Sequence, residues 1–143
     1  MPNLFDEVVP GQRLHRSFRS LRDDSVHMPA RELMQRAFAS LTDADGNFRE
    51  QFQTTGFDPR VWELYLDQYF RSAGFAIRRL ARPDFLIERE GTEVTVEATS
   101  SNPTQGPEQP DLDLQSEEGI NWLMNQYLPI KYGSTLYSKL RER

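Results

Sequence analysis

The sequence predicts an α/β fold, with a small mixed β-sheet flanked by helices. Two changes of period along the chain predict this class. Apolar residues recur at helical spacing as far as Gly74, and the pattern then alternates, as in β-strands, up to residue 99. Helical spacing returns from Ile120 onward. With 143 residues, the chain is long enough to form one domain with its own hydrophobic core.

The amino-acid composition argues against several classes of protein and of binding site. The net charge of −5 argues against indiscriminate binding to nucleic acid through bulk positive charge. The absence of cysteine excludes disulfides and thiolate zinc sites. The first residues do not resemble a signal peptide, and no segment approaches the roughly 20 apolar residues that span a bilayer. We therefore expect a cytoplasmic protein that does not bind membranes.

Residues 1–56 are predicted to form a helical N-terminal extension that packs on the core. A short helix over residues 12–22 carries Leu14, Phe18 and Leu21 on one face. Its other faces carry four arginines, which form either a solvated surface or a surface that contacts phosphates: Arg13, Arg16, Arg19 and Arg22. A second helix is expected from Pro29 to Leu41, before a turn-forming cluster at 42–47.

The third helix has clear predicted ends. Asp58 is a good N-cap, Pro59 suits the first helical position, and Gly74 supplies the C-terminal stop. Glu63 falls at the edge of the apolar face of this helix. Such a half-hidden carboxylate forms either an interfacial salt bridge or part of a functional site.

Three strands are predicted after Gly74, over residues 75–80, 84–89 and 92–99, with a tight turn at Glu90 and Gly91. A two-residue turn would pair Ile87 with Val94 and Phe85 with Val96 on one face. The same register would set Asp84 directly across from Glu97, whereas a three-residue loop would set Asp84 across from Ala98.

Two opposed carboxylates need an explanation. Directly paired residues have Cβ atoms about 4.5–5.5 Å apart, and at that separation two anions repel by roughly 3–4 kcal/mol at an effective dielectric constant of about 20. A hard divalent cation such as Mg²⁺ or Mn²⁺ would offset this cost. The alternative is an ordinary polar sheet face. The register also opposes Glu88 and Glu93 near the hairpin tip, where water screens them and no metal is needed.

The rest of the chain is predicted to be a long loop at residues 100–116 and two helical pieces. Pro129 is expected to end or kink the first piece, and Ser134 to cap the second. His15 and His27, the two histidines, share no metal-ligand spacing, and no phosphate-binding glycine loop occurs.

The order of these elements resembles the core of the PD-(D/E)XK (restriction-endonuclease-like) nuclease superfamily over residues 57–143. The resemblance rests on a helix bearing Glu63, then Pro83-Asp84 at the start of a strand, then Glu97-Ala98-Thr99 thirteen residues after Asp84 at the end of the next strand. The chain is also similar to uncharacterised bacterial proteins that share its Asp-Phe-Leu and Val-Glu-Ala-Thr strands.

The resemblance implies roles for particular residues. Asp84 and Glu97 would be metal ligands for Mg²⁺ or Mn²⁺, Ala98 would offer its carbonyl, and Glu63 would be an accessory ligand or position water. The implied reaction is hydrolysis of a phosphodiester bond in DNA, which by analogy with the family would serve defence against foreign DNA.

Two features depart from the family pattern. Thr99 stands where the family has its lysine, and the candidates for a relocated lysine are Lys131 and Lys139 in the final helical region. The family's last edge strand is also missing. Three explanations stay open: a naturally short protein, a fragment, or a homodimer or partner protein that completes the sheet edge.

Three functional hypotheses therefore remain. The first is a Mg²⁺-dependent deoxyribonuclease, with Glu63, Asp84, Glu97 and Lys131 as candidate catalytic residues. The second is a catalytically degenerate module that keeps the fold to bind nucleic acid or protein. The third is a purely structural or assembly role. Thr99 favours the second hypothesis, and the three retained acids favour the first.

Overall fold

The computed structural model describes residues 2–43, 46–80, 83–101 and 114–141. The chain divides into two compact units, Met1–Ala98 and Thr99–Arg143, which are described separately. The domain division predicted at residues 56 and 57 falls inside the first unit, because the N-terminal helices pack directly against the helix that begins at Phe57. The long loop predicted at 100–116 falls mostly on residues outside the described ranges.

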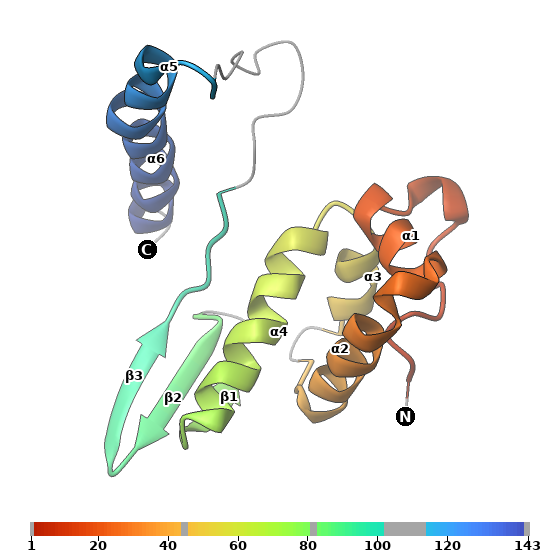
Figure 1. Ribbon diagram of the computed structural model, residues 1–143. Coiled ribbons are helices and arrows are strands. Elements are labelled where there is room, and N and C mark those ends of the chain that lie inside the picture. Colours follow the sequence, from red (N-terminus) through yellow and green to blue (C-terminus); the bar gives the residue numbers. More distant parts are fainter. Residues whose placement is uncertain (1, 44–45, 81–82, 102–113, 142–143) are drawn as a thin grey trace. The chain divides into compact units, whose positions relative to one another are not determined.

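In the first unit, the helical segments come first along the chain and a small β-sheet follows them (Figure 1). Its helical segments are η1 (Gly11–Arg13), α1 (Arg16–Asp23), η2 (Ser25–His27), α2 (Met28–Ser40), α3 (Phe48–Gln53) and α4 (Phe57–Ser72). The expected first and second helices are thus present, the first beginning later than expected. The helix α3 was not expected from the sequence, although Phe48 and Phe52 lie four residues apart on its buried side.

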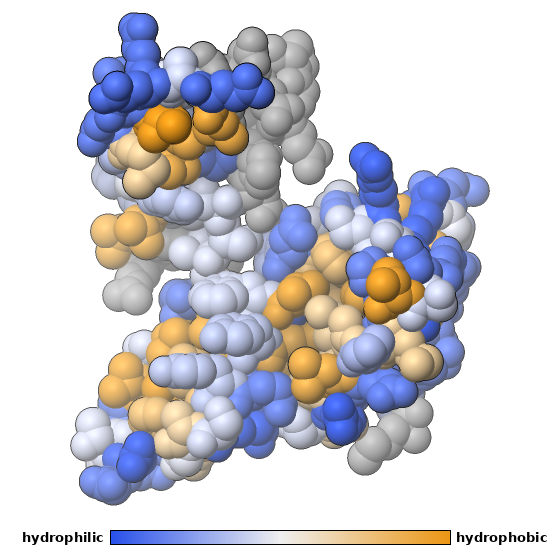
Figure 2. Space-filling model, viewed as in Figure 1, coloured by the Kyte–Doolittle hydropathy of each residue, from blue (hydrophilic) through white to orange (hydrophobic). Residues whose placement is uncertain are grey.

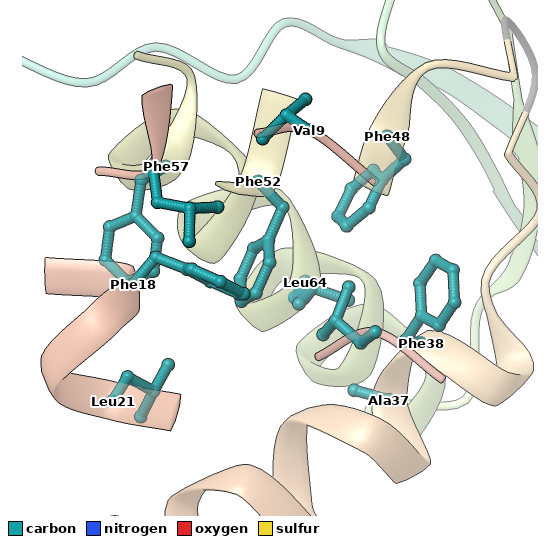
Figure 3. Packing of buried hydrophobic residues seen from close by; sticks show 11 residues of the cluster. Val9, Phe18, Leu21, Ala37, Phe38, Phe48, Phe52, Phe57 and Leu64 are labelled. Carbon is teal, nitrogen blue, oxygen red and sulfur yellow. The ribbon is translucent and has the colours of Figure 1, made fainter. Parts of the chain in front are cut away.

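Aromatic side chains fill the core of the helical part, as the close view in Figure 3 shows. Phe18 and Phe52 are fully buried and meet edge to face, with ring centroids 5.7 Å apart. Gln53, also fully buried, accepts a hydrogen bond from the amide of Val8 and donates to the carbonyl of Leu4. The side chain of Gln53 therefore connects the N-terminal segment to α3, and its buried amide oxygen and nitrogen both have hydrogen-bond partners.

The start of α4 differs from the sequence expectation. The helix begins at Phe57 and follows Gly56, whose carbonyl accepts the first helical bond from the amide of Arg60. Asp58, expected as the N-cap, lies instead within the first turn. The physical reason is the burial of Phe57 in the aromatic core, which fixes it on the helix. The stop at Gly74 is confirmed, and its backbone has a φ of 82°.

The sheet has the strand order β1-β2-β3, formed by β1 (Ala76–Arg79), β2 (Phe85–Arg89) and β3 (Thr92–Val96). Both ladders are antiparallel, so the described sheet is not the mixed sheet expected from the sequence. The reason is local: only five residues separate β1 from β2 and two separate β2 from β3, whereas parallel pairing would require a long crossover. Among the described residues, no further strand follows β3.

The predicted hairpin register is confirmed. Phe85 pairs with Val96, and Ile87 pairs with Val94. Glu90 and Gly91 form the two-residue turn with φ values of 54° and 79°, the left-handed combination that suits the twist of a hairpin. The ring of Phe85 is fully buried and lies 5.8 Å from that of Phe70, so α4 covers this face of the sheet.

The second unit is a helical segment made of α5 (Glu117–Trp122), the π-helical η3 (Leu123–Tyr127) and α6 (Leu128–Arg141). Pro129 was expected to end or kink the helix, yet helical structure continues through it. The wider π turn lets the amide of Leu128 bond the carbonyl of Leu123, just before the proline that lacks an amide. Ser134 is not a cap, because its hydroxyl donates to the carbonyl of Lys131 within α6.

No helix in the described part of the chain is both long and apolar enough to cross a bilayer.

Candidate functional site

The candidate site lies at the open end of the β2–β3 hairpin, opposite its turn. Asp84 directly precedes β2 and Glu97 directly follows β3, so the two form the next position beyond the last pair of the ladder, Phe85 and Val96. Both acids are half-buried. The sequence-predicted register therefore brings the two candidate ligands to the same end of neighbouring strands.

A hydrogen bond fixes the carboxylate of Asp84. The amide of Ala98 donates to Oδ2 of Asp84 at 2.7 Å. Ala98 lies two residues beyond the end of β3, so this bond ties the carboxylate of Asp84 to the backbone that follows the strand. A carboxylate has lone pairs for further partners.

Glu63 is more buried than expected, with 7% of its surface exposed. Its Oε2 accepts a hydrogen bond from Nη1 of Arg60 at 2.8 Å and another from Nη2 of Arg79. Arg60 lies three residues before Glu63 on α4, a spacing visible in the sequence. Arg79 comes from β1 and could not be found by spacing. This candidate metal or water-positioning acid is therefore bound by two guanidinium groups.

Arg79 is the functional candidate that sequence reasoning missed. Its side chain is 6% exposed, and its guanidinium carbon lies 4.5 Å from the ring centroid of Phe85. Glu63 accepts a bond from Nη2, whereas Nε and Nη1 are buried and have no acceptor among the described residues. A buried guanidinium with two unused donors is unusual, because such donors lose water without gaining a partner.

The acids at the hairpin tip provide a reference for those at the open end. Glu88 and Glu93 are cross-strand partners, as predicted. Glu93 accepts a bond from Arg78 at 2.7 Å, and Glu88 accepts one from the amide of Gly91 at 2.7 Å. Figure 2 shows hydrophilic residues gathered at this tip. An arginine and a backbone amide therefore each bond one member of this like-charged pair.

In the described ranges, no group of three or more histidine, cysteine or acidic side chains is placed to hold a metal ion. The predicted metal set is smaller than such a group, since it contains two carboxylates, from Asp84 and Glu97, and the carbonyl of Ala98. Glu63 is engaged by Arg60 and Arg79 instead. The chemistry available at the open end is thus that of two carboxylates and a backbone.

The candidate lysines lie in the second unit. Nζ of Lys131 donates to the hydroxyl of Tyr127 at 3.2 Å and lies 5.4 Å from the centre of that ring. The side chain of Lys139 lies outside the described residues. Thr99, the residue in the family's lysine position, is the first residue of the second unit and is half-buried.

Three of the four arginines that the sequence places on the first predicted helix, residues 12–22, form bonds within the protein. Arg13 pairs with Glu50 at 3.5 Å, and Arg19 donates to the carbonyl of Gly11. Arg22 donates to Asp23 at 2.6 Å and thereby lowers the pKa of that carboxyl below its usual range. These intramolecular partners favour the interpretation of this surface as a solvated helix face over a phosphate-binding one.

Comparison with known proteins adds no relative. No family model matches the chain, and neither a curated protein nor a solved structure does. The functional argument therefore rests on the residues and their geometry.

Proposed function

We propose that this protein is a metal-dependent nuclease that hydrolyses phosphodiester bonds in DNA, with Asp84 and Glu97 holding Mg²⁺ or Mn²⁺. The observation that carries the proposal is the hairpin register, which sets these two half-buried acids side by side at the ends of neighbouring strands. Ordered carboxylates so placed favour a hard divalent cation.

The arrangement of elements supports a restriction-endonuclease-like core. A long helix bearing Glu63 precedes an antiparallel three-stranded meander, and the candidate acids flank its second and third strands. A cytoplasmic setting belongs to the same proposal. So does a second copy or partner protein that pairs with an outer strand, because β1 and β3 each pair with β2 alone among the described strands.

The donor set fits the cation. Carboxylate and carbonyl oxygens are hard ligands, and Mg²⁺ commonly binds one or two carboxylates while keeping several waters. Asp84, Glu97 and the carbonyl of Ala98 would therefore suffice to hold it. The amide of Ala98 orients the carboxylate of Asp84 through the 2.7 Å hydrogen bond, as outer partners do for metal ligands.

The bound cation would supply a water of lowered pKa and neutralise charge on the phosphate. The side chains of Asp84 and Glu97 would hold the cation through their carboxylate oxygens. In the proposed reaction, the oxygen of water bonds to phosphorus, the bond from phosphorus to the leaving sugar oxygen breaks, and that oxygen takes up a proton.

A second function is favoured by two features of the molecule. Glu63 is bound by Arg60 and Arg79, and Thr99 carries no positive charge. Both features suit a degenerate module that retains the fold for binding nucleic acid or protein. The two functions differ in whether a cation binds at Asp84 and whether DNA is cut.

Calorimetric titration with Mn²⁺ tests the metal site. We expect wild-type protein to bind Mn²⁺ with micromolar-to-millimolar affinity and Asp84→Asn to lose that binding. The matched control is Glu93→Gln, which removes a carboxylate from the other acid pair of the same hairpin and should bind like wild type. Equal heats for wild type and Asp84→Asn would reject the metal site.

A plasmid-nicking assay then separates the two functions. Cleavage should require Mg²⁺ or Mn²⁺, stop in EDTA and be lost in Glu97→Gln. Metal binding without cleavage would favour the degenerate module, and cleavage that persists in Glu97→Gln would exclude the catalytic role of this residue.

A further inference from the structure

We propose that the second unit binds one nucleotide of a single DNA strand, with the base against the indole of Trp122 and the phosphate at Lys131. The inference rests on the proposed function, because it names the part of the chain that captures the substrate strand. The site lies wholly within the helical segment formed by α5, η3 and α6.

A hollow of about 450 Å³ lies along one side of this segment. Two aromatic rings, a cation and polar groups line it, together with one aliphatic side chain: Trp122, Gln126, Tyr127, Ile130, Lys131 and Ser134. Aromatic rings stack on bases of any sequence, and a neighbouring cation attracts the phosphate. The composition of the hollow therefore matches a nucleotide, which presents a flat base and an anion.

The π turn aligns the two rings. Trp122 and Tyr127 are five residues apart, a spacing that in an α-helix sets side chains about 140° apart around the axis. The turn is closed by the bond from the amide of Leu128 to the carbonyl of Leu123, five residues earlier. This wider turn brings residues five apart to the same side of the helix. The rings accordingly stack, with 5.5 Å between their centroids and 26° between their planes.

Lys131 places a positive charge beside this pair. Its Nζ lies 5.4 Å from the ring centroid of Tyr127 and donates to the hydroxyl of that residue at 3.2 Å. An ammonium group has three donors, so two remain for phosphate oxygens.

The surrounding sequence leaves this charge unopposed. From Gly119 to Ser138, Lys131 is the one charged residue, so no carboxylate of this stretch repels a phosphate. Glu117 and Glu118 precede the stretch, before Trp122. The phosphate therefore belongs at the Lys131 end of the hollow and the base at the Trp122 end.

The exposure of Trp122 favours a single strand over a duplex. The residue is 38% exposed, so part of the indole is open to a ligand. In a duplex, neighbouring base pairs cover the faces of each base, whereas a single strand offers those faces to aromatic side chains. The expected ligand is therefore single-stranded DNA, or an unpaired segment of a duplex.

Binding of oligothymidine tests the inference. We would measure the anisotropy of labelled oligothymidine with the full chain, in EDTA and across a range of salt. Trp122→Leu should weaken binding about tenfold, as expected for the loss of one base stack. Lys131→Met should reduce the slope of log affinity against log salt by about 0.7, the value for one phosphate contact to a single strand. Lys131→Arg keeps the charge and should keep the slope.

Trp62→Leu is the matched control. Trp62 is 39% exposed and stacks on Tyr65 with 5.3 Å between the ring centroids, but its helix α4 carries no lysine. Its loss should leave the affinity for oligothymidine unchanged.

The control variant also gives a second measurement with the site intact. The chain has two tryptophans, so Trp62→Leu leaves Trp122 alone. Oligothymidine should quench the fluorescence of this variant, and a duplex should not. The fluorescence of Trp122→Leu, which comes from Trp62, should not change with either DNA.

Three outcomes would overturn the inference: equal affinity of wild type and Trp122→Leu for oligothymidine, no quenching in Trp62→Leu, or no binding by wild-type protein. Self-association that Trp122→Leu abolishes, with no loss of oligothymidine binding, would also overturn it and assign the hollow to a second copy of the chain. None of these measurements needs metal. Failure of the proposed function would appear instead as missing Mn²⁺ heats or missing cleavage, so the two failures can be told apart.

Discussion

The two ends of the β2–β3 hairpin carry the same kind of residue in different settings. At the tip, Glu88 and Glu93 face each other, and Glu93 pairs with an arginine that is 66% exposed at its side chain. At the open end, Asp84 and Glu97 are half-buried, and Asp84 accepts a backbone amide. Behind this end of the sheet, Glu63 is almost fully buried between Arg60 and Arg79. Removing an acid should therefore change the free energy of unfolding little at the tip and more at the open end or behind it.

The largest effect on stability is expected from Glu63→Ala. The substitution leaves the guanidinium groups of Arg60 and Arg79 in a buried place without their carboxylate, which should cost about 3–5 kcal/mol of unfolding free energy. Urea denaturation measures this loss. Glu93→Ala is the matched control, because it breaks an exposed ion pair and should cost about 0–1 kcal/mol. If the two substitutions lowered the free energy of unfolding equally, buried and exposed acids would not differ in their contribution to stability.

An intermediate effect is expected from Asp84→Ala. The amide of Ala98 would lose its acceptor in a half-buried place, which should cost about 1–3 kcal/mol in urea denaturation with EDTA present. Asp84→Asn keeps an oxygen that can accept this bond and should unfold close to wild type. The pair of variants separates the structural role of Asp84 from its proposed metal role, since Asp84→Asn should still lose Mn²⁺ binding.

The sequence predicted the hairpin well because its signals are local. Alternation over residues 84–97 and a glycine in the turn favour the two-residue turn over a three-residue loop, since a slip of one residue would turn Phe85 and Ile87 away from α4. The same locality explains why the sequence could place Asp84 and Glu97 together.

The sequence predictions failed where contacts between distant parts of the chain determine the structure. Asp58 has the chemistry of a cap, but burial of Phe57 extends the helix past it. Pro129 does not end the helical segment, one of the two outcomes predicted for it, because the π turn before it absorbs the missing amide. The ion pair between Glu63 and Arg79 joins residues sixteen positions apart on a helix and a strand. The spacing of apolar residues predicts which face of a helix or strand a residue occupies, but it does not predict which residue of another element it contacts there.

The smallest expected effect has the opposite sign and concerns the turn itself. Glu90 adopts a φ of 54°, which costs an ordinary side chain about 1–2 kcal/mol, whereas asparagine is favoured at this position before glycine. Glu90→Asn should therefore stabilise the protein by about 1 kcal/mol in urea denaturation.

Gly91→Ala is the complementary variant, since its φ of 79° penalises any Cβ, and it should destabilise the protein. Neither substitution should alter Mn²⁺ binding, because each acts at the tip, which five ladder pairs separate from Asp84 and Glu97. A change in metal affinity from either variant would mean that the turn transmits its register to Asp84 and Glu97, and that the two ends of the hairpin do not act independently.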